Sequence, residues 1–191
     1  MRPFTFLTIS ATLALSGCVS YNNVAPTGNL KLNADEGLVI IGVPPGARLS
    51  FHSGDITDGK FTQDRLPEGI SGYSEDGYFV RKLKATQDGR GYGMVSLTLN
   101  RVFAPGCGQK MAVLSVKPGQ VQYYGNFSFV NKGNSVGIRY DSDPASARQY
   151  ITNSFPNLAL PFEDGIAQSL EQGFCVKGGG TTYIPIFIPG R

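Results

Sequence analysis

The chain has 191 residues with a formal net charge of +3, and 41% of its residues are hydrophobic while only 16% are charged. This length is enough for one domain with a real hydrophobic core. The small net charge and the scattered positions of the lysines and arginines argue against a nucleic-acid-binding protein.

Residues 1–17 have the layout of a secretory signal peptide. Arg2 supplies one cation, residues 4–15 form a short apolar stretch, and the small residues Ser16 and Gly17 follow. A helix that spans a bilayer needs about 20 apolar residues, so this stretch is too short for a permanent anchor. It also lacks the amphipathic stripe of a core helix. We therefore expect residues 1–17 to be absent from the mature protein.

The segment Leu15-Ser16-Gly17-Cys18 resembles the lipobox of bacterial lipoproteins. The resemblance implies that the chain is cut before Cys18, that the Cys18 thiol carries a diacylglycerol, and that its amine takes a further acyl chain such as palmitate. Two or three acyl chains anchor a protein stably, whereas one chain holds it only marginally. No separate transmembrane helix is needed for such an anchor.

The residues after Cys18 predict an address and a domain boundary. In this lipoprotein class an aspartate at the next position retains the protein in the inner membrane, and this chain has Val19 there. The outer membrane, facing the periplasm, is therefore the expected location. Residues 18–34 are interpreted as the lipidated cysteine and a polar tether, and residues 35–191 as a single β-rich globular domain.

Runs of apolar and β-branched residues between Gly- and Pro-containing turns predict a mainly β domain. Residues 37–43 form a continuous apolar run, which predicts a strand buried on both faces, with residues 47–52 as its hairpin partner. The polar residues 53–77 are expected to form a long irregular loop. Residues 78–83 predict a further strand. In residues 92–102 the alternation places Val95, Leu97 and Leu99 on one face.

The second half of the chain predicts more strands and two helices. Strands are expected at residues 111–116 and 120–131. The second of these strands has Val121, Tyr123, Phe127 and Phe129 on one face. A turn at residues 132–134 leads to its hairpin partner at residues 135–141. Asp143 and Pro144 supply an N-cap and an N1 proline for a helix that ends at Pro156.

A second helix is predicted from Phe162, Ile166 and Leu170, which recur at helical spacing before Gly173. Residues 181–188 form a last β segment at a sheet edge. Together these elements predict an antiparallel β-sandwich-like domain with two short helices near the C-terminus. The segment 116–126, VKPGQVQYYGN, resembles envelope lipoproteins with uncharacterised β-sandwich domains; the resemblance implies a fold and an address, but no activity.

The cysteines fit an oxidising compartment. With Cys18 used by lipid, Cys107 and Cys175 remain, and we expect a disulfide between them. This bond would close a loop of roughly 70 residues and contribute roughly 4 kcal/mol in the chain-entropy model. Two separate buried thiols are the alternative. A zinc site is disfavoured because His52 is the only histidine.

Several motifs suggest chemistry, but none meets the requirements of its class. Residues 54–60 have P-loop spacing, yet Phe61 stands where a Ser or Thr should bind magnesium. The glycine-rich segment 89–93 precedes a strand rather than a helix and is interpreted as a turn. His52 has no nucleophile elbow to serve. Four carboxylate pairs match neither a glycosidase nor a calcium-loop pattern; they are Asp35/Glu36, Glu75/Asp76, Asp141/Asp143 and Glu163/Asp164.

The sequence therefore predicts no catalytic residue, metal site or cofactor. Our first hypothesis is a membrane-anchored envelope lipoprotein without catalytic activity, which acts as an interaction or envelope-assembly module with a protein partner. One alternative is a cell-envelope hydrolase that uses a carboxylate pair or His52. Another is a carrier of a small apolar ligand, with Tyr123, Phe127 and Phe129 lining a cavity between sheet and helices.

Overall fold

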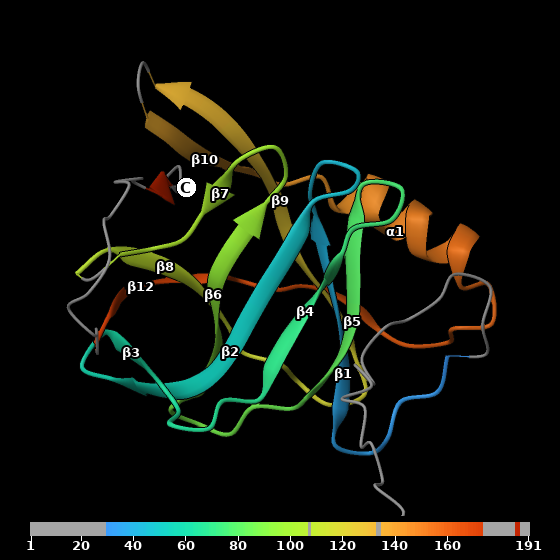
Figure 1. Ribbon diagram of the computed structural model, residues 1–191. Coiled ribbons are helices and arrows are strands. Elements are labelled where there is room, and N and C mark those ends of the chain that lie inside the picture. Colours follow the sequence, from blue (N-terminus) through green and yellow to red (C-terminus); the bar gives the residue numbers. More distant parts are fainter. Residues whose placement is uncertain (1–29, 107, 133–134, 174–185, 188–191) are drawn as a thin grey trace, which may run out of the picture.

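The computed structural model of the chain describes residues 30–106, 108–132, 135–173 and 186–187 (Figure 1). Within these residues the prediction of a mainly β fold is confirmed. The strands are β1 (Glu36–Gly42), β2 (Arg48–Thr57), β3 (Lys60–Gln63), β4 (Gly69–Tyr73), β5 (Tyr78–Lys84), β6 (Arg90–Thr98), β7 (Val102–Phe103), β8 (Lys110–Leu114), β9 (Val121–Lys132), β10 (Ser135–Asp141), β11 (Phe162–Asp164), β12 (Gln168–Gln172) and β13 (Ile186–Phe187). One helix, α1 (Pro144–Ser154), accompanies them.

The first sheet has the strand order β13-β10-β9-β1-β5, with β11 beside β9. β1 lies between β5, to which it is antiparallel, and β9, to which it is parallel. Its residues from Leu38 to Ile41 are fully buried, which confirms the prediction of a strand covered on both faces. Parallel pairs also join β11 to β9, β12 to β3 and β10 to β13, so the sheets are mixed, although most strand pairs are antiparallel as predicted.

The predicted hairpin between residues 37–43 and 47–52 is also wrong. The turn after β1 closes with a hydrogen bond from Ala47 N–H to the Pro44 carbonyl (3.0 Å) and passes through Gly46 at φ 76°. It carries the chain into the second sheet, where β2 pairs with β4, β3 and β6. A short turn rich in Pro and Gly therefore does not imply that the flanking strands pair with each other.

The second sheet closes on itself. Its order is β4-β2-β3-β12-β8-β6-β7, and an additional pairing of β2 with β6 completes a ring of five strands, β2-β3-β12-β8-β6. One apolar cluster has a member from every strand of this ring, which places the cluster in the ring's interior; its residues are Ile56, Phe61, Val95, Met111, Val113 and Leu170. Small closed barrels are filled by side chains in this way.

Two further apolar clusters hold the layers together. The largest lies between the two sheets and includes Val39 and Phe79 from the first sheet and Phe51, Met94 and Leu114 from the second. The other lies on the opposite face of the first sheet, where α1 covers Leu38 and Ile40 with Ala147, Ile151 and Phe155 (Figure 1). Leu30 and Leu32, ahead of β1, are partly buried against this outer cluster.

The first predicted helix is confirmed as α1. The Asp143 side chain accepts a hydrogen bond from the Ser146 N–H (3.1 Å), and Pro144 occupies the first turn. This contact satisfies one of the backbone donors that every helix start leaves unpaired. Ala147 and Ile151, four residues apart on one face, are the buried positions. The predicted end at Pro156 is also close to the observed end at Ser154.

The second predicted helix is wrong, because residues 162–172 form β11 and β12. Phe162 pairs with Val121 of β9, and Leu170 pairs with Met111 of β8. Ile166, the middle member of the supposed helical stripe, is 68% exposed in the connection between the strands. The three apolar residues therefore serve two different sheets, and tertiary pairing outweighs their helical spacing.

The interpretation of residues 53–77 as an irregular loop is wrong as well. β2 continues to Thr57, and β3 and β4 follow. Asp58 and Gly59, both at positive φ (51° and 73°), form the two-residue turn between β2 and β3. Two positive φ angles at the centre of a hairpin are the signature of the type I′ turn, which favours an Asp-Gly pair.

Two β-bulges change which side chains face the core. In the pairing of β2 with β6, Ser50 lies opposite Ser96 and the next residue, Phe51, lies opposite Met94, so β6 has one extra residue at this point. Because of this bulge, Leu97 faces the core between the sheets while Val95 faces the ring interior. In β9, the register shifts between Tyr123 and Asn126. The single-face assignments made from alternation are therefore wrong in both strands, since an inserted residue moves every later side chain to the other face.

Candidate functional site

A cavity of about 430 Å³ lies where β4 begins, β5 ends and β6 begins. Its size falls within the range of ordinary small-ligand sites. The side chains that line it and carry polar groups are Ser53, Glu68, Lys84, Thr86, Gln87, Arg90 and Tyr92. They come from both sheets, because β5 belongs to the first sheet while β2 and β6 belong to the second.

The inner wall of this cavity is fixed by the buried Tyr92, which is 4% exposed. Its hydroxyl donates to the backbone carbonyl of Lys84 (3.3 Å), so it joins β6 to the end of β5. Burial raises the pKa of Tyr92, and the charge of the nearby Glu68 adds to this rise. Tyr92 is therefore a neutral hydrogen-bonding group with Glu68 and Lys84 close to its hydroxyl.

A second wall consists of an ion-pair network around Arg90. Arg90 Nη2 lies 2.7 Å from Asp64 Oδ2, and Arg90 Nη1 lies 3.1 Å from Asp64 Oδ1 and 2.6 Å from Asp55 Oδ1. The hydroxyl of Ser53 donates to Asp64 Oδ2 (2.6 Å) and accepts from the Glu68 N–H (2.9 Å). Bidentate pairing of this kind restricts both partners, so this wall is ordered and its cation is compensated.

The pKa values of the network agree with that geometry. The hydrogen bonds from Ser53 and Arg90 lower the pKa of Asp64. The same contacts with Asp64 and Asp55 raise the pKa of Arg90. Both groups therefore remain charged over a wider pH range than they would in water.

Three other polar side chains at the cavity are uncommitted. Within the described residues, the side chains of Glu68, Lys84 and Gln87 form no hydrogen bond or ion pair, and all three residues are exposed. They offer an acceptor, a donor and an amide that can do either. A polar ligand could therefore bind here without breaking an existing contact.

A second hollow of about 350 Å³ lies beside the junction of β1, β5, β9 and β10. Its polar lining includes Asn126, Ser128, Arg139 and Asp141. Arg139 and Asp141 already face each other at 4.0 Å, and the Asn126 Oδ1 atom accepts from the Tyr123 hydroxyl (2.8 Å). Most of its polar groups are therefore used by the fold, which makes it the weaker candidate.

Arg81 is the one charged residue that is buried in the part of the chain the structure describes, with 5% exposure. Its Nη1 donates to the Val80 carbonyl (2.6 Å), its Nη2 donates to the Tyr73 carbonyl (3.3 Å), and its guanidinium lies 4.5 Å from the centre of the Phe79 ring. Burial lowers the pKa of Arg81. It links β4 and β5, the edge strands of the two sheets, which run side by side in Figure 1.

The residues considered for catalysis do not form one site. Ser50 bonds to Ser71, and Ser53 bonds to Asp64, so neither hydroxyl is hydrogen-bonded to His52. The Nδ1 atom of His52 is buried without a hydrogen-bond partner. The four carboxylate pairs lie at the start of β1, in the β4–β5 turn, around the start of α1 and in β11. Across the described ranges, no group of His, Cys, Asp and Glu has the arrangement of a metal site.

The two glycine-rich motifs have structural roles. In residues 54–60, Asp58 and Gly59 form the β2–β3 turn, and no helix follows to receive a phosphate. In residues 89–93, Gly89 is at φ 74°, and the remainder belongs to β6. The interpretation of the second motif as a turn therefore holds for its first residue alone.

The aromatic residues considered for an apolar cavity face different layers. Tyr123 is buried in the outer cluster beneath α1, whereas Phe127 is buried in the core between the sheets, and Phe129 packs against that core. Their packing shows that they fill two separate cores. A cavity that all three line together is therefore not part of the described fold.

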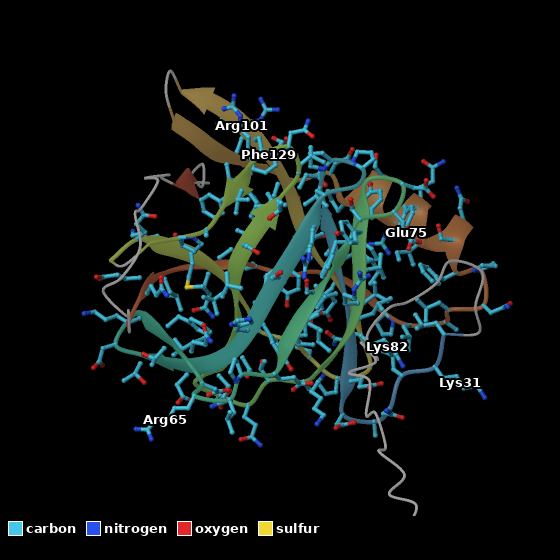
Figure 2. All side chains as sticks on the ribbon, viewed as in Figure 1. Lys31, Arg65, Glu75, Lys82, Arg101 and Phe129 are labelled. Atoms are coloured by element: carbon cyan, nitrogen blue, oxygen red, sulfur yellow. The ribbon has the colours of Figure 1, made fainter. Side chains whose placement is uncertain are left out.

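The residues predicted to carry covalent modifications, Cys18, Cys107 and Cys175, lie outside the described residues. Among the helices of the described segments, none has the length and hydropathy needed to span a bilayer. The cationic side chains are dispersed, with Arg65, Arg101 and Lys31 on three separate sides of the molecule (Figure 2).

The cavity residues Glu68, Lys84 and Gln87 were not predicted. Residues 53–77 were interpreted as a loop, so Glu68 had no assigned place relative to β5. The Asp-Gly pairs at 58–59 and 76–77 are the signal that could have placed it, because each marks a tight turn between strands.

Comparison of the chain with protein-family models, with curated proteins and with solved structures finds no match.

Proposed function

We propose that this chain is a bacterial envelope lipoprotein whose β domain is a binding module without catalytic activity, held at the outer membrane by lipid on Cys18. The observation that carries the proposal is the segment Leu15-Ser16-Gly17-Cys18 directly behind a short apolar stretch and a single cation. In the lipoproteins that it resembles, such a segment directs lipidation and cleavage.

The composition of the segment after Cys18 supports this proposal. Residues 20–29 are polar and contain Pro26 and Gly28, which is typical of a tether, and the first described strand, β1, begins at Glu36. We therefore propose that the β domain is held close to the membrane surface with its cavity open to the periplasm.

The binding role rests on the geometry of the site. Three uncommitted polar side chains border the cavity, whereas the candidate catalytic groups lie on separate elements. Efficient acid–base or nucleophilic chemistry needs those groups within hydrogen-bond reach of each other or of one reacting atom. The arrangement therefore favours recognition of a ligand or partner over turnover.

The fold itself fits such a module. We propose to describe it as a β-sandwich in which the second sheet curls into a closed ring, since one shared core joins the sheets and a separate core fills the ring. Both cores are packed with large side chains, such as Phe51 and Phe61. A rigid scaffold of this kind holds surface side chains in fixed positions.

Lipidation can be tested with an alkyne analogue of palmitate in the bacterium that produces the protein. The full chain should be labelled and should sediment with the outer membrane, and Cys18→Ser should abolish both results. Val19→Asp is the matched variant: it should keep the label but move the protein to the inner membrane. An unlabelled wild-type chain, or a label that survives Cys18→Ser, would contradict the proposal.

A further inference from the structure

The cavity at the start of β4 and the end of β5 is lined by two charges of opposite sign that have no partner among the described residues. Arg90 is paired with Asp55 and Asp64, so its charge is compensated inside the protein. The Lys84 ammonium and the Glu68 carboxylate, by contrast, form no ion pair among the described residues. The site therefore presents one available cation and one available anion.

We infer that this cavity binds a small zwitterionic molecule of amino-acid to dipeptide size, with its carboxylate toward Lys84 and its ammonium toward Glu68. A ligand with a single charge would be attracted by one of these groups and repelled by the other. A ligand with both charges satisfies both groups, and the Gln87 amide can complete the hydrogen bonding. This inference deepens the proposed binding role and depends on it.

The geometry agrees with a ligand of this size. The volume of about 430 Å³ is at the lower end of the range for small-molecule sites, about 300–1,000 Å³. Tyr92 holds the end of β5 through the Lys84 carbonyl, and Ser53 holds the Glu68 N–H. The backbones that carry the two charges are therefore fixed to β6 and β2 before any ligand arrives, which reduces the entropic cost of binding.

The charges are exposed, and this sets the expected strength of binding. Ion pairs at such positions are individually weak and are screened by salt. We expect affinity to fall as ionic strength rises, and we expect both ends of the ligand to be required.

The test is isothermal titration of the full-length chain in a nonionic detergent with dialanine, N-acetyl-dialanine, dialanine amide and glucose. Dialanine should bind saturably, and each capped peptide should bind about three- to fivefold more weakly. Glu68→Gln should weaken dialanine binding and strengthen N-acetyl-dialanine binding, because it removes the carboxylate that repels this anion. Lys84→Gln should weaken dialanine binding and strengthen binding of the amide, because it removes the ammonium that repels this cation.

Two matched variants serve as controls. Lys60→Gln on β3 and Asp164→Asn on β11 remove one exposed charge of each sign away from the cavity, and neither should change dialanine binding. Absence of saturable dialanine binding, equal binding of free and capped peptides, or binding of glucose alone would each overturn the inference. The anchoring proposal is tested separately by labelling at Cys18, so the two failures can be distinguished.

Discussion

The packing of the five-strand ring predicts that Gly93→Ala destabilises the protein. A Cβ atom at Gly93 would lie 2.5 Å from Phe61 Cε1 and 2.8 Å from Met111 Cε. Non-bonded carbons prefer about 3.5–4.0 Å, so the Phe61 ring would have to move by roughly 1 Å. On its other side, the ring already lies 2.6 Å from the position that a Cβ of Gly54 would occupy. Phe61 is therefore held between two glycines and has little room to shift.

The expected cost is the difference between two effects. Overpacking of a full core costs about 1–3 kcal/mol, while replacing a strand glycine with alanine recovers about 0.5–1 kcal/mol of backbone entropy. We expect a net loss of about 1–2 kcal/mol, which lowers the Tm of a domain of this size by roughly 2–8 °C. The measurement is thermal and urea unfolding of the full-length chain, followed by circular dichroism.

Gly69→Ala is the matched control. The nearest atoms to a Cβ at Gly69 belong to His52 and lie 3.7 Å away, which is ordinary contact. Its unfolding free energy should equal that of wild type or exceed it by up to about 1 kcal/mol, because the backbone entropy is recovered without overpacking. In addition, Phe61→Leu should reduce the cost of Gly93→Ala, with a coupling of about 1 kcal/mol between the two sites. A neutral Gly93→Ala, or full additivity with Phe61→Leu, would show that Phe61 does not fill the ring as described.

Three further predictions concern charge and covalent structure. Arg81→Met removes a buried charge and keeps the side-chain volume, so it should change the unfolding free energy in urea titrations by less than about 1.5 kcal/mol. Arg81→Ala should cost about 2–4 kcal/mol, because it leaves a cavity. Equal effects of the two variants would contradict this prediction. The pKa of Asp64 is lowered in the fold, so its stabilisation is present above the unfolded pKa, near 3.9, and is lost as the pH falls through the folded pKa. Asp64→Asn should therefore be less stable than wild type at pH 7, and thermal melts should show this difference shrinking below about pH 4; a difference independent of pH would refute the assignment. Peptide mass spectrometry without reduction should find Cys107 linked to Cys175, and recovery of both as alkylated thiols would exclude that disulfide.

The elements that depend on local chemistry could be predicted from the sequence. α1 begins where Asp143 and Pro144 provide a cap and a fixed φ angle, and both act on the first turn of the same helix. The β9–β10 hairpin was also predicted, and its pairing of Phe129 with Ile138 agrees with the expected strands. In both cases, the residues that decide the structure lie within a few positions of each other.

The error over the second helix concerns contacts that the local sequence does not contain. Phe162, Ile166 and Leu170 have helical spacing, but Phe162 pairs with Val121 of β9 and Leu170 pairs with Met111 of β8, some 40 to 60 positions away. An isolated pattern cannot show that two sheet edges are available to receive those residues. Strand preference depends on such neighbours far more than helix preference does.

The bulges explain why side-chain faces were harder to predict than strands. Alternation assigns faces correctly until a residue is inserted, and after that every assignment is reversed. In β9 the side-chain faces are reversed near Gly125, which has φ 80°. Tyr123 therefore packs in the outer cluster, whereas Phe127 packs in the core between the sheets. A single strand can therefore contribute to two cores, although simple alternation assigns it to one.

The candidate cavity depends on the same non-local contacts. Glu68 precedes β4, Lys84 ends β5, and Tyr92 lies in β6, so no spacing in the sequence relates the three. They meet because β2 pairs with both β4 and β6, while the β4–β5 turn carries the chain from the second sheet to the first. Since β4 and β5 belong to different sheets, they do not form a hairpin ladder beyond the Glu75–Tyr78 bridge. The cavity lies at the other end of these two strands, where residues 85–89 carry the chain from β5 of the first sheet to β6 of the second. Its two uncompensated charges, on Glu68 and Lys84, therefore come from the strand ends that are farthest from the β4–β5 turn.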